Sequence, residues 1–398
     1  MRGTLVRTTW RHDPAAYAPP RYRRACEYEA FVPAPLGGDA FTLPAEPVGV
    51  LSEAERAIGA LNARAHPALQ PLARLLLRTE SIASSKVEGL QVDARGLARA
   101  EVRRDLGAQV GADALEVLAN VDAMQLAVEE AADDERLELH HLLRIHAALM
   151  RGAPGATMAG RTRDVQNWVG GNDYTPCGAD FVPPPAEQVA ALLEDLVEFC
   201  NAEELPPLLQ AALAHAQFET IHPFVDGNGR TGRALVHVLL RRRGLAPAYV
   251  PPISVVLARD RDGYIAGLTA FREGGLAVWV ERFAAAAAEA ALLASAYLDA
   301  VARLQEDWRA AVAARGAPRS QSAVWSVIAI LPAHPIVSVP VATAASGRSK
   351  PAVNQAVAQL ENAGVLIPMS DARRNRSWEA RGLLDLLSAL EAGRPLAG

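Results

Sequence analysis

The stretch HPFVDGNGRTGR, His222 to Arg233, places three glycines, two arginines, a carboxylate, an amide and an imidazole within twelve residues. It follows a long apolar pattern typical of a helix. Its glycines imitate three known patterns: the dinucleotide fingerprint GxGxxG, the phosphate loop GxxxxGK(S/T), and the start of a calcium loop. At most one of these interpretations can hold, so the residues around the glycines must decide.

None of the three patterns fits its context. A dinucleotide fingerprint needs a preceding strand, whereas LLQAALAHAQFETIHPF indicates a helix and a turn. A phosphate loop needs Lys and then Ser or Thr after its last glycine, where this chain has Arg233 and Ala234. A calcium loop that began at Asp226 would need Gly at position 6 and Glu at position 12. Those positions hold Thr231 and His237.

The chemistry shared by these patterns still indicates a phosphate site. Glycines let backbone N–H groups approach an anion, and a helix that begins near Arg230 points its positive end at the same place. Arg230 and Arg233 lie three residues apart on one helix face and suit two phosphate groups. Asp226 is a hard oxygen ligand for Mg²⁺, and His222 is a candidate general base for a hydroxyl. The stretch therefore predicts a phosphoanhydride clamp beside a base.

The same stretch resembles the Fic domain motif, HxFx(D/E)GNGRxxR. Every defined position of the motif is matched here by His222, Phe224, Asp226, Gly227, Asn228, Gly229, Arg230 and Arg233. The segment YEAFVPAPL and the stretch at 161–185 are also similar to Fic proteins of the larger bacterial type. Together these similarities cover residues 20–300.

The resemblance implies a protein adenylyltransferase, in which His222 deprotonates a Ser, Thr or Tyr hydroxyl that then attacks the α-phosphate of ATP. It assigns Mg²⁺ to Asp226, and it implies ATP and a hydroxyl-bearing protein, this chain included, as substrates. Gly229 stands where a kinase-like branch of the family has Lys, which favours nucleotidyl transfer. The residues that it implies for ATP and phosphate binding are Gly227, Asn228, Gly229, Arg230, Gly232, Arg233 and, near the adenine, Tyr264.

The segment SSKVEG, Ser84 to Gly89, matches (S/T)xxxE(G/N), which marks an inhibitory helix in the resembled family. Helical spacing places Ser84 and Glu88 on one face. The plain alternative is an ordinary helix end followed by a capping glycine. Because the segment precedes a complete motif, we interpret Glu88 as an inhibitory carboxylate that competes with ATP phosphate for Arg233.

The predicted fold is mainly α, with a helical Fic-type core, a short β-hairpin flap at 161–185 and a C-terminal winged helix-turn-helix. We expect three domains, at 1–105, 106–315 and 316–398. Residues 1–48 lack sustained periodicity and are expected to form an extended arm. Ser52 and Glu55 have the spacing of a capping box that opens a helix.

The net charge of −5 argues against a protein that binds nucleic acid over its whole surface, but residues 317–398 carry +3. Arg373, Arg374 and Arg376 are therefore candidate DNA contacts, with a solvated hairpin or a protein-interaction module as the alternatives. A nucleotide-sensing DNA-binding regulator is the second function, and a Fic enzyme that removes AMP or transfers another nucleotide is the third. A second copy of the chain is a further candidate partner.

Three cysteines, Cys26, Cys177 and Cys200, are an odd number without CxxC spacing, so neither a disulfide framework nor a cysteine zinc site is predicted. A reducing cytoplasm is the expected compartment, and no membrane segment is expected. The remaining histidines of interest are expected to be satisfied core or surface residues, and no structural metal is predicted. These are His140, His141, His146 and His215.

Overall fold

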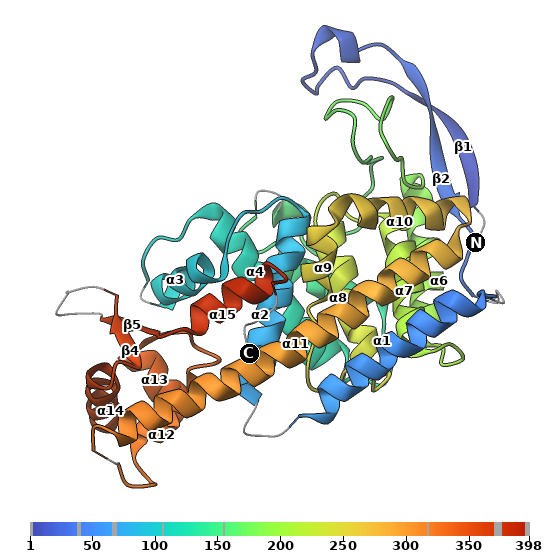
Figure 1. The fold of residues 1–398 in the computed structure, drawn as a ribbon. Coiled ribbons are helices and arrows are strands. Elements are labelled where there is room, and N and C mark those ends of the chain that lie inside the picture. Colours follow the sequence, from blue (N-terminus) through green and yellow to red (C-terminus); the bar gives the residue numbers. More distant parts are fainter. Residues whose placement is uncertain are drawn as a thin grey trace. The chain divides into compact units, whose positions relative to one another are not determined.

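The computed structural model describes residues 3–37, 41–65, 70–105, 107–153, 156–316, 318–369 and 376–394. Within them the chain is mainly helical with small antiparallel sheets, as predicted (Figure 1). The chain forms two compact units whose segments alternate along the sequence. The first unit takes Met1–Glu53, Leu126–Gly244 and Asp262–Ala285, and the second takes Ala54–Gln125, Leu245–Arg261 and Ala286–Gly398. The three consecutive domains stay a prediction.

The first unit is built around a buried helix. Its α7 (Pro207–Ile221) is apolar on nearly every side and buries almost all of its residues, as expected of a central core helix. Around it are α5 (Leu139–Leu149), α6 (Val189–Asn201), α8 (Asn228–Arg242), α10 (Arg261–Glu273), a π-helical turn (Ala127–Ala131) and the start of α11 (Leu276–Ala313). No helix in the described ranges is both long and apolar enough to cross a membrane.

The N-terminal segment is a β-hairpin rather than an arm without regular structure. Strands β1 (Gly3–Trp10) and β2 (Cys26–Pro33) pair antiparallel from Gly3↔Pro33 to Trp10↔Cys26. Most of their residues are partly exposed, so the apolar alternation that marks a half-buried strand is weak. The predicted extended conformation is present in both strands, but their pairing into a hairpin was not predicted.

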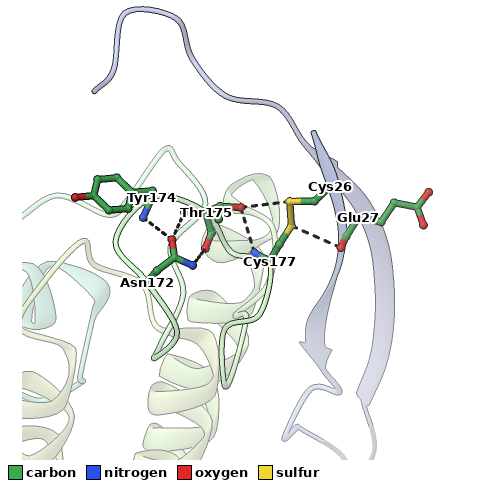
Figure 2. The surroundings of a disulfide bond; sticks show 6 residues. All are labelled: Cys26, Glu27, Asn172, Tyr174, Thr175 and Cys177. Carbon is green, nitrogen blue, oxygen red and sulfur yellow. Dashed lines mark hydrogen bonds between the residues drawn. A yellow bond between two sulfur atoms is a disulfide. The ribbon is translucent and has the colours of Figure 1, made fainter. Parts of the chain in front are cut away.

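The predicted flap at 161–185 lies beside this hairpin and is joined to it covalently (Figure 1). Its strand pairing is one antiparallel bridge, Val169↔Phe181. A disulfide joins Cys26 of β2 to Cys177 of the flap, and Thr175 lies against it (Figure 2). The prediction of no disulfide was wrong, because a pair separated by 151 residues leaves no spacing signal. The expectation of a reducing compartment was based on the absence of a disulfide, so this bond removes that argument.

The helices that precede the C-terminal part of the second unit include the one that carries the predicted inhibitory segment. They are the larger part of α1 (Ala45–Ala63), α2 (Gln70–Val87), α3 (Ala94–Asp105), α4 (Ala112–Leu126), α9 (Ile253–Arg259) and most of α11. The predicted capping box at Ser52 was wrong: α1 already begins at Ala45, and the Ser52 hydroxyl donates to the Val48 carbonyl inside the helix. The predicted end of α2 is confirmed, since Gly89 follows it with φ +93°.

The C-terminal part of the second unit has the predicted order of helices and strands. It comprises α12 (Ala323–Ile330), β3 (Ile336–Ser338), α13 (Val339–Ser346), α14 (Lys350–Asn362), β4 (Leu366–Pro368), β5 (Ser377–Ala380) and α15 (Leu383–Glu391). The strands form one antiparallel sheet in the order β3-β5-β4. Arg373 and Arg374 lie outside the described residues, and the winged-helix assignment stays a prediction.

Candidate active site

The loop between α7 and α8 begins at a strained residue. His222 caps α7 with φ 49° and ψ 60°, and among the described residues it is the non-glycine with positive φ. Such a conformation persists only where its surroundings hold it. Here the His222 N–H donates to Phe218, and its carbonyl accepts from Arg163 Nε at 2.9 Å and Asn167 Nδ2 at 3.3 Å. The backbone that carries the imidazole is thereby fixed from both sides.

Arg163 is the residue that organises this end of α7. Its buried guanidinium donates to the carbonyls of His222, Ile221, Pro184 and Val165. Burial lowers its pKa to about 10, so the group stays protonated at neutral pH. Nothing in the local sequence marks Arg163 as important, because its partners are backbone carbonyls from separate segments. Its role was therefore not predicted from the sequence.

Replacing Arg163 with methionine should destabilise the protein by about 3 kcal/mol or more, because it leaves several carbonyls without their donor. Urea denaturation followed by circular dichroism measures this free energy of unfolding. Arg161→Met is the matched control, since Arg161 is exposed. Equal, small effects of the two changes would contradict the role given to Arg163.

The loop closes on itself through Asn228, the first residue of α8. Its Oδ1 accepts from the Phe224 N–H and its Nδ2 donates to the Phe224 carbonyl, both at 2.8 Å. Asn167 Nδ2 donates to the same carbonyl at 2.9 Å, and the Phe224 ring is fully buried. The Asn228 amide therefore shapes the loop and retains at most one N–H for the α-phosphate contact that the resemblance implies.

His146 supports the loop from α5. Its ring stacks on Phe224 with centroids 3.7 Å apart, its Nδ1 accepts from the Gly160 N–H, and its Nε2 lies 3.0 Å from the Asp226 carbonyl. The bond from Gly160 places the proton on Nε2, which donates to Asp226. Burial lowers the pKa of His146 to about 4, so the ring is neutral. The prediction of a satisfied core histidine is confirmed, and its bond to Asp226 adds a loop-positioning role.

The carboxylate of Asp226 faces outward from the loop. Its side chain is 63% exposed, and Oδ1 accepts from the Gly227 N–H at 2.6 Å. Gly227 has φ +78°, and a Cβ there would come within 3.0 Å of Leu149 Cδ2. Glycine is thus required at 227, and the tight turn leaves the second carboxylate oxygen available to a hard cation.

The first turn of α8 has the features of an anion site. Gly227 is its N-cap and supplies no side-chain cap, so the leading N–H groups around Asn228 and Gly229 are suited to a ligand. Arg230 and Arg233 are both buried within this unit, and Arg230 Nη2 lies 3.7 Å from Asp226 Oδ1. The helix therefore combines N-terminal N–H groups with two fixed positive charges.

Close packing of α8 on α7 explains Gly232. A Cβ at this position would lie 2.8 Å from Glu219 Oε1 and 2.9 Å from Phe218 Cδ1. Glu219 stands one turn before His222, with Oε2 4.0 Å from His222 Nδ1. The absence of a side chain at 232 lets α8 approach this carboxylate–imidazole pair. The predicted phosphate contact of Gly232 stays a prediction.

Tyr264 lies in the core of the first unit. It is 5% exposed, its hydroxyl lies 2.9 Å from His215 Nε2, and its ring is adjacent to Trp279. Burial lowers the pKa of His215 to about 3, so this histidine is a neutral residue of the core, as predicted. The suggested place of Tyr264 near the adenine finds no support in these contacts, which explain the residue as part of the aromatic core.

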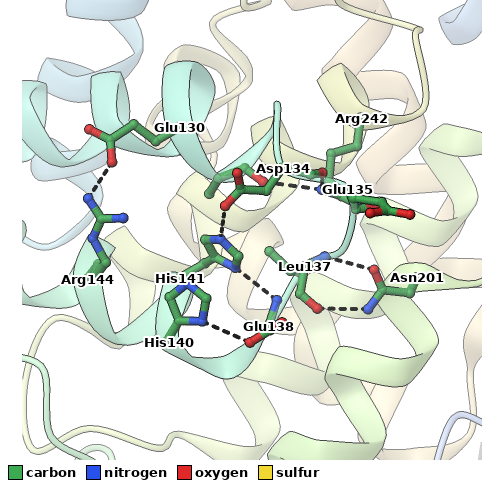
Figure 3. Close-up of polar contacts among 11 residues, drawn as sticks. Glu130, Asp134, Glu135, Leu137, Glu138, His140, His141, Arg144, Asn201 and Arg242 are labelled. Atoms are coloured by element: carbon green, nitrogen blue, oxygen red, sulfur yellow. Dashed lines mark hydrogen bonds and ion pairs between the residues drawn. The ribbon is translucent and has the colours of Figure 1, made fainter.

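A cluster of Asp134, His140 and His141 resembles a metal site, with ligand atoms within 4.8 Å of one another (Figure 3). His141 Nδ1, however, accepts from the Glu138 N–H at 2.9 Å in a capping box that opens α5. The proton is therefore on Nε2, which donates to Asp134 Oδ2 at 2.5 Å. Metal binding at Nε2 would require the opposite tautomer, so we assign the cluster to capping of α5.

Comparison with known proteins identifies the domain that carries this loop. The model of the Fic/DOC family matches residues 136–240, and that of the Fic/DOC family N-terminal region matches residues 48–129. The chain is a Fic domain protein. The first match contains the whole motif and the second contains the segment from Ser84 to Gly89.

Named relatives of this Fic domain protein are similar over part of their length. Protein adenylyltransferase fic-1 of Caenorhabditis elegans is 31% identical over 186 residues, which are 46% of this chain and 32% of the relative. Protein adenylyltransferase Fic of Drosophila grimshawi is 35% identical over 159 residues, 39% of this chain and 28% of the relative. The chain thus spans about a third of the length of these curated relatives.

Solved Fic structures share the fold. A Fic family protein from Desulfovibrio desulfuricans G20 is 22% identical with a TM-score of 0.51, covering 86% of this chain and 98% of that one. Residues 134–508 of C. elegans Fic-1 are 23% identical with a TM-score of 0.51, covering 64% of this chain and 73% of that one. At these identities the likeness shows the fold alone.

The predicted inhibitory residues of the Fic domain protein lie at the end of α2. Ser84 is buried in the last turn, and Glu88 is exposed directly after it, with its N–H donating to the Ser85 carbonyl. Both belong to the second unit, whereas Arg233 belongs to the first. Competition between Glu88 and phosphate for Arg233 stays a prediction.

Proposed function

We propose that this protein is a protein adenylyltransferase that transfers AMP from ATP to a Ser, Thr or Tyr hydroxyl of a protein. The observation that carries the proposal is the loop itself. A histidine at the strained end of α7 is joined by five residues to the N-terminus of a helix that carries two buried arginines. The printed names of the relatives, protein adenylyltransferase, support the same activity.

His222 acts as the general base. Its imidazole takes the proton of the target hydroxyl while the hydroxyl oxygen bonds to the α-phosphorus of ATP, and the bond from that phosphorus to the pyrophosphate oxygen breaks. The carboxylate of Glu219, 4.0 Å from Nδ1, stabilises the imidazolium that forms. The backbone bonds from Arg163 and Asn167 keep the imidazole in place during the step.

The phosphates are held by the start of α8. Backbone N–H groups around Asn228 and Gly229 suit the α-phosphate, and the guanidinium groups of Arg230 and Arg233 suit the remaining phosphates bidentately. Because both arginines are already buried in the unit, little side-chain entropy is lost when ATP binds.

Mg²⁺ is the cation that Asp226 fits. The carboxylate is exposed, beside the phosphate site, and its bond to the Gly227 N–H leaves one oxygen for the ion. When bound, Mg²⁺ would neutralise charge on the phosphate oxygens. Asp226 itself is kept in position by the His146 bond to its carbonyl.

Incubation of the protein with a cell lysate and one α-labelled nucleotide at a time tests the proposal. We expect labelled protein bands with ATP and much weaker bands with GTP, CTP and UTP. Stronger labelling by one of the other nucleotides would show that the enzyme transfers that nucleotide rather than AMP. Loss of label from a pre-labelled protein, without new labelling, would favour the AMP-removing enzyme.

We further propose that Glu88 inhibits the enzyme. A carboxylate that bonds to Arg233 competes with the terminal phosphate of ATP. One guanidinium group cannot form bidentate hydrogen bonds to both anions at once. The match of the N-terminal family model to residues 48–129 supports this proposal, because that range contains the segment from Ser84 to Gly89.

DNA binding by the C-terminal elements α12 to α15 is the second candidate function. The order of helices and strands from α12 to β5 favours it. We expect only a small contribution from Arg376, since its guanidinium bonds to Glu361 at 3.0 Å and lies over the Trp378 ring. The remaining charge of the predicted hairpin is carried by Arg373 and Arg374.

Replacing Arg373, Arg374 and Arg376 together with glutamine should weaken DNA binding and lower its salt slope by about one unit per lost phosphate contact. Gel-shift titrations at several salt concentrations measure this, and Arg376→Gln alone is the control with a small expected effect. AMP transfer should be unchanged. If the parent protein shows no DNA binding even at low salt, the protein-interaction alternative is favoured.

A further inference from the structure

Helix α15 forms an ion pair with the end of α2. The residue of α2 that takes part is Lys86, two residues before Glu88. Lys86 Nζ lies 3.0 Å from Glu391 Oε2, and the Glu391 side chain is only 4% exposed. Helices α2 and α15 are in contact within the second unit (Figure 1). Burial raises the pKa of Glu391, while the neighbouring ammonium of Lys86 acts against that rise. A desolvated pair of this kind is costly to break from one side.

A second tie lies just after Glu88, on α3. Arg95 Nη1 bonds to both carboxylate oxygens of Glu379 in β5, at 2.7 and 2.6 Å, and its Nη2 lies 3.2 Å from Asp385 of α15. The connection between α2 and α3 is thus anchored at both ends by the C-terminal elements. Glu88 lies inside this connection.

The end of α2 has one more fixed point. Arg261 Nε donates to the Val87 carbonyl at 2.8 Å, which caps the last turn of the helix. With Lys86 held from one side and Val87 from the other, the direction in which the chain leaves α2 toward Glu88 is set by groups outside that helix.

We propose that the C-terminal elements from β5 to α15 control AMP transfer by holding the Glu88 segment in its inhibitory position. This inference rests on the proposed inhibition by Glu88. A ligand that binds these elements and moves α15 or β5 releases the segment, provided that it binds the released state more tightly. The ion pairs of Glu391 and Glu379 then transmit a movement of the C-terminal elements to the Glu88 segment.

Glu391→Gln in the full-length protein tests the inference, because it removes the charge that holds Lys86 and keeps the side-chain size. We expect AMP incorporation from α-labelled ATP to rise by about fivefold or more, equivalent to ~1 kcal/mol. Glu379→Gln, which breaks the Arg95 tie, should act in the same direction. Amide hydrogen exchange in the last turn of α2 should become faster in both variants and stay unchanged in α7.

The matched control is Asp299→Asn, which also removes one carboxylate of an ion pair in the second unit. Its partner Arg64 directly follows the end of α1, and Asp299 lies on α11, so neither residue belongs to α2 or to the elements from β5 to α15. This variant should transfer AMP at the parent rate. All three changes are also made in the Glu88→Gly background, where we expect no additional activation.

The outcomes separate this inference from the inhibition on which it rests. If Glu88→Gly activates and both tie variants behave like Asp299→Asn, inhibition by Glu88 stands and the C-terminal control is overturned. Activation by Glu391→Gln that persists in the Glu88→Gly background would also overturn it, since the effect would then bypass Glu88. If Glu88→Gly itself gives no activation, the inhibition fails and this inference fails with it.

Discussion

Replacing His222 with alanine should lower the rate of AMP transfer by about 10²–10⁴-fold while leaving ATP affinity nearly unchanged. In the proposed mechanism the imidazole acts on the incoming hydroxyl, whereas the phosphates bind at the start of α8 and at the buried Arg230 and Arg233. Initial rates with α-labelled ATP measure the first effect, and isothermal titration calorimetry with ATP measures the second.

Because residue 222 has positive φ, alanine there could also destabilise the loop, so a second variant is needed. His222→Asn removes the base with a residue that tolerates positive φ, so it should lose activity to the same extent without loss of stability. His140→Ala is the control, because His140 is an exposed histidine at the start of α5. Full AMP incorporation by either His222 variant would remove this residue from the mechanism.

Replacing Glu88 with glycine should raise the rates of self-modification and target adenylylation by an order of magnitude or more, because misalignment of reacting groups is costly in rate. Under the proposed inhibition, ATP binds while Glu88 holds Arg233, but its α-phosphate is displaced from the line of attack. Glu88 follows the end of α2, so glycine there leaves the helix intact. Gel autoradiography with and without lysate measures both rates.

Two further variants distinguish relief of competition from loosening of the fold. Glu88→Gln keeps the size of the side chain and removes its charge, so it should also activate. Arg233→Ala should be poorly active whether or not Glu88 is present, because it removes the group for which both anions compete. A Glu88→Gly protein that is folded by circular dichroism and transfers AMP no faster than the parent would rule out inhibition by this carboxylate.

The features that the sequence predicted well are those set by neighbouring residues. The turn at Gly227 and the end of α2 before Gly89 depend on a local need for positive φ, which glycine meets. The long apolar pattern before His222 became the buried helix α7. In each case residue type and spacing within a few positions determine the structure.

The features that were missed depend on residues far apart in the chain. Arg163 bonds to backbone carbonyls, whose identity leaves no trace in the sequence, and Cys26 pairs with Cys177 across 151 residues. Ser52 had the spacing of a cap but lies inside a helix that starts earlier. Tertiary packing decided each of these positions.

The most direct test of the account compares two labels on ATP with purified Glu88→Gly protein and Mg²⁺. We expect label on the α-phosphate to enter protein and label on the γ-phosphate not to, with incorporation lost in the Glu88→Gly, His222→Ala double variant. Entry of the γ-label, or no entry of either label, would contradict AMP transfer as the function of this site.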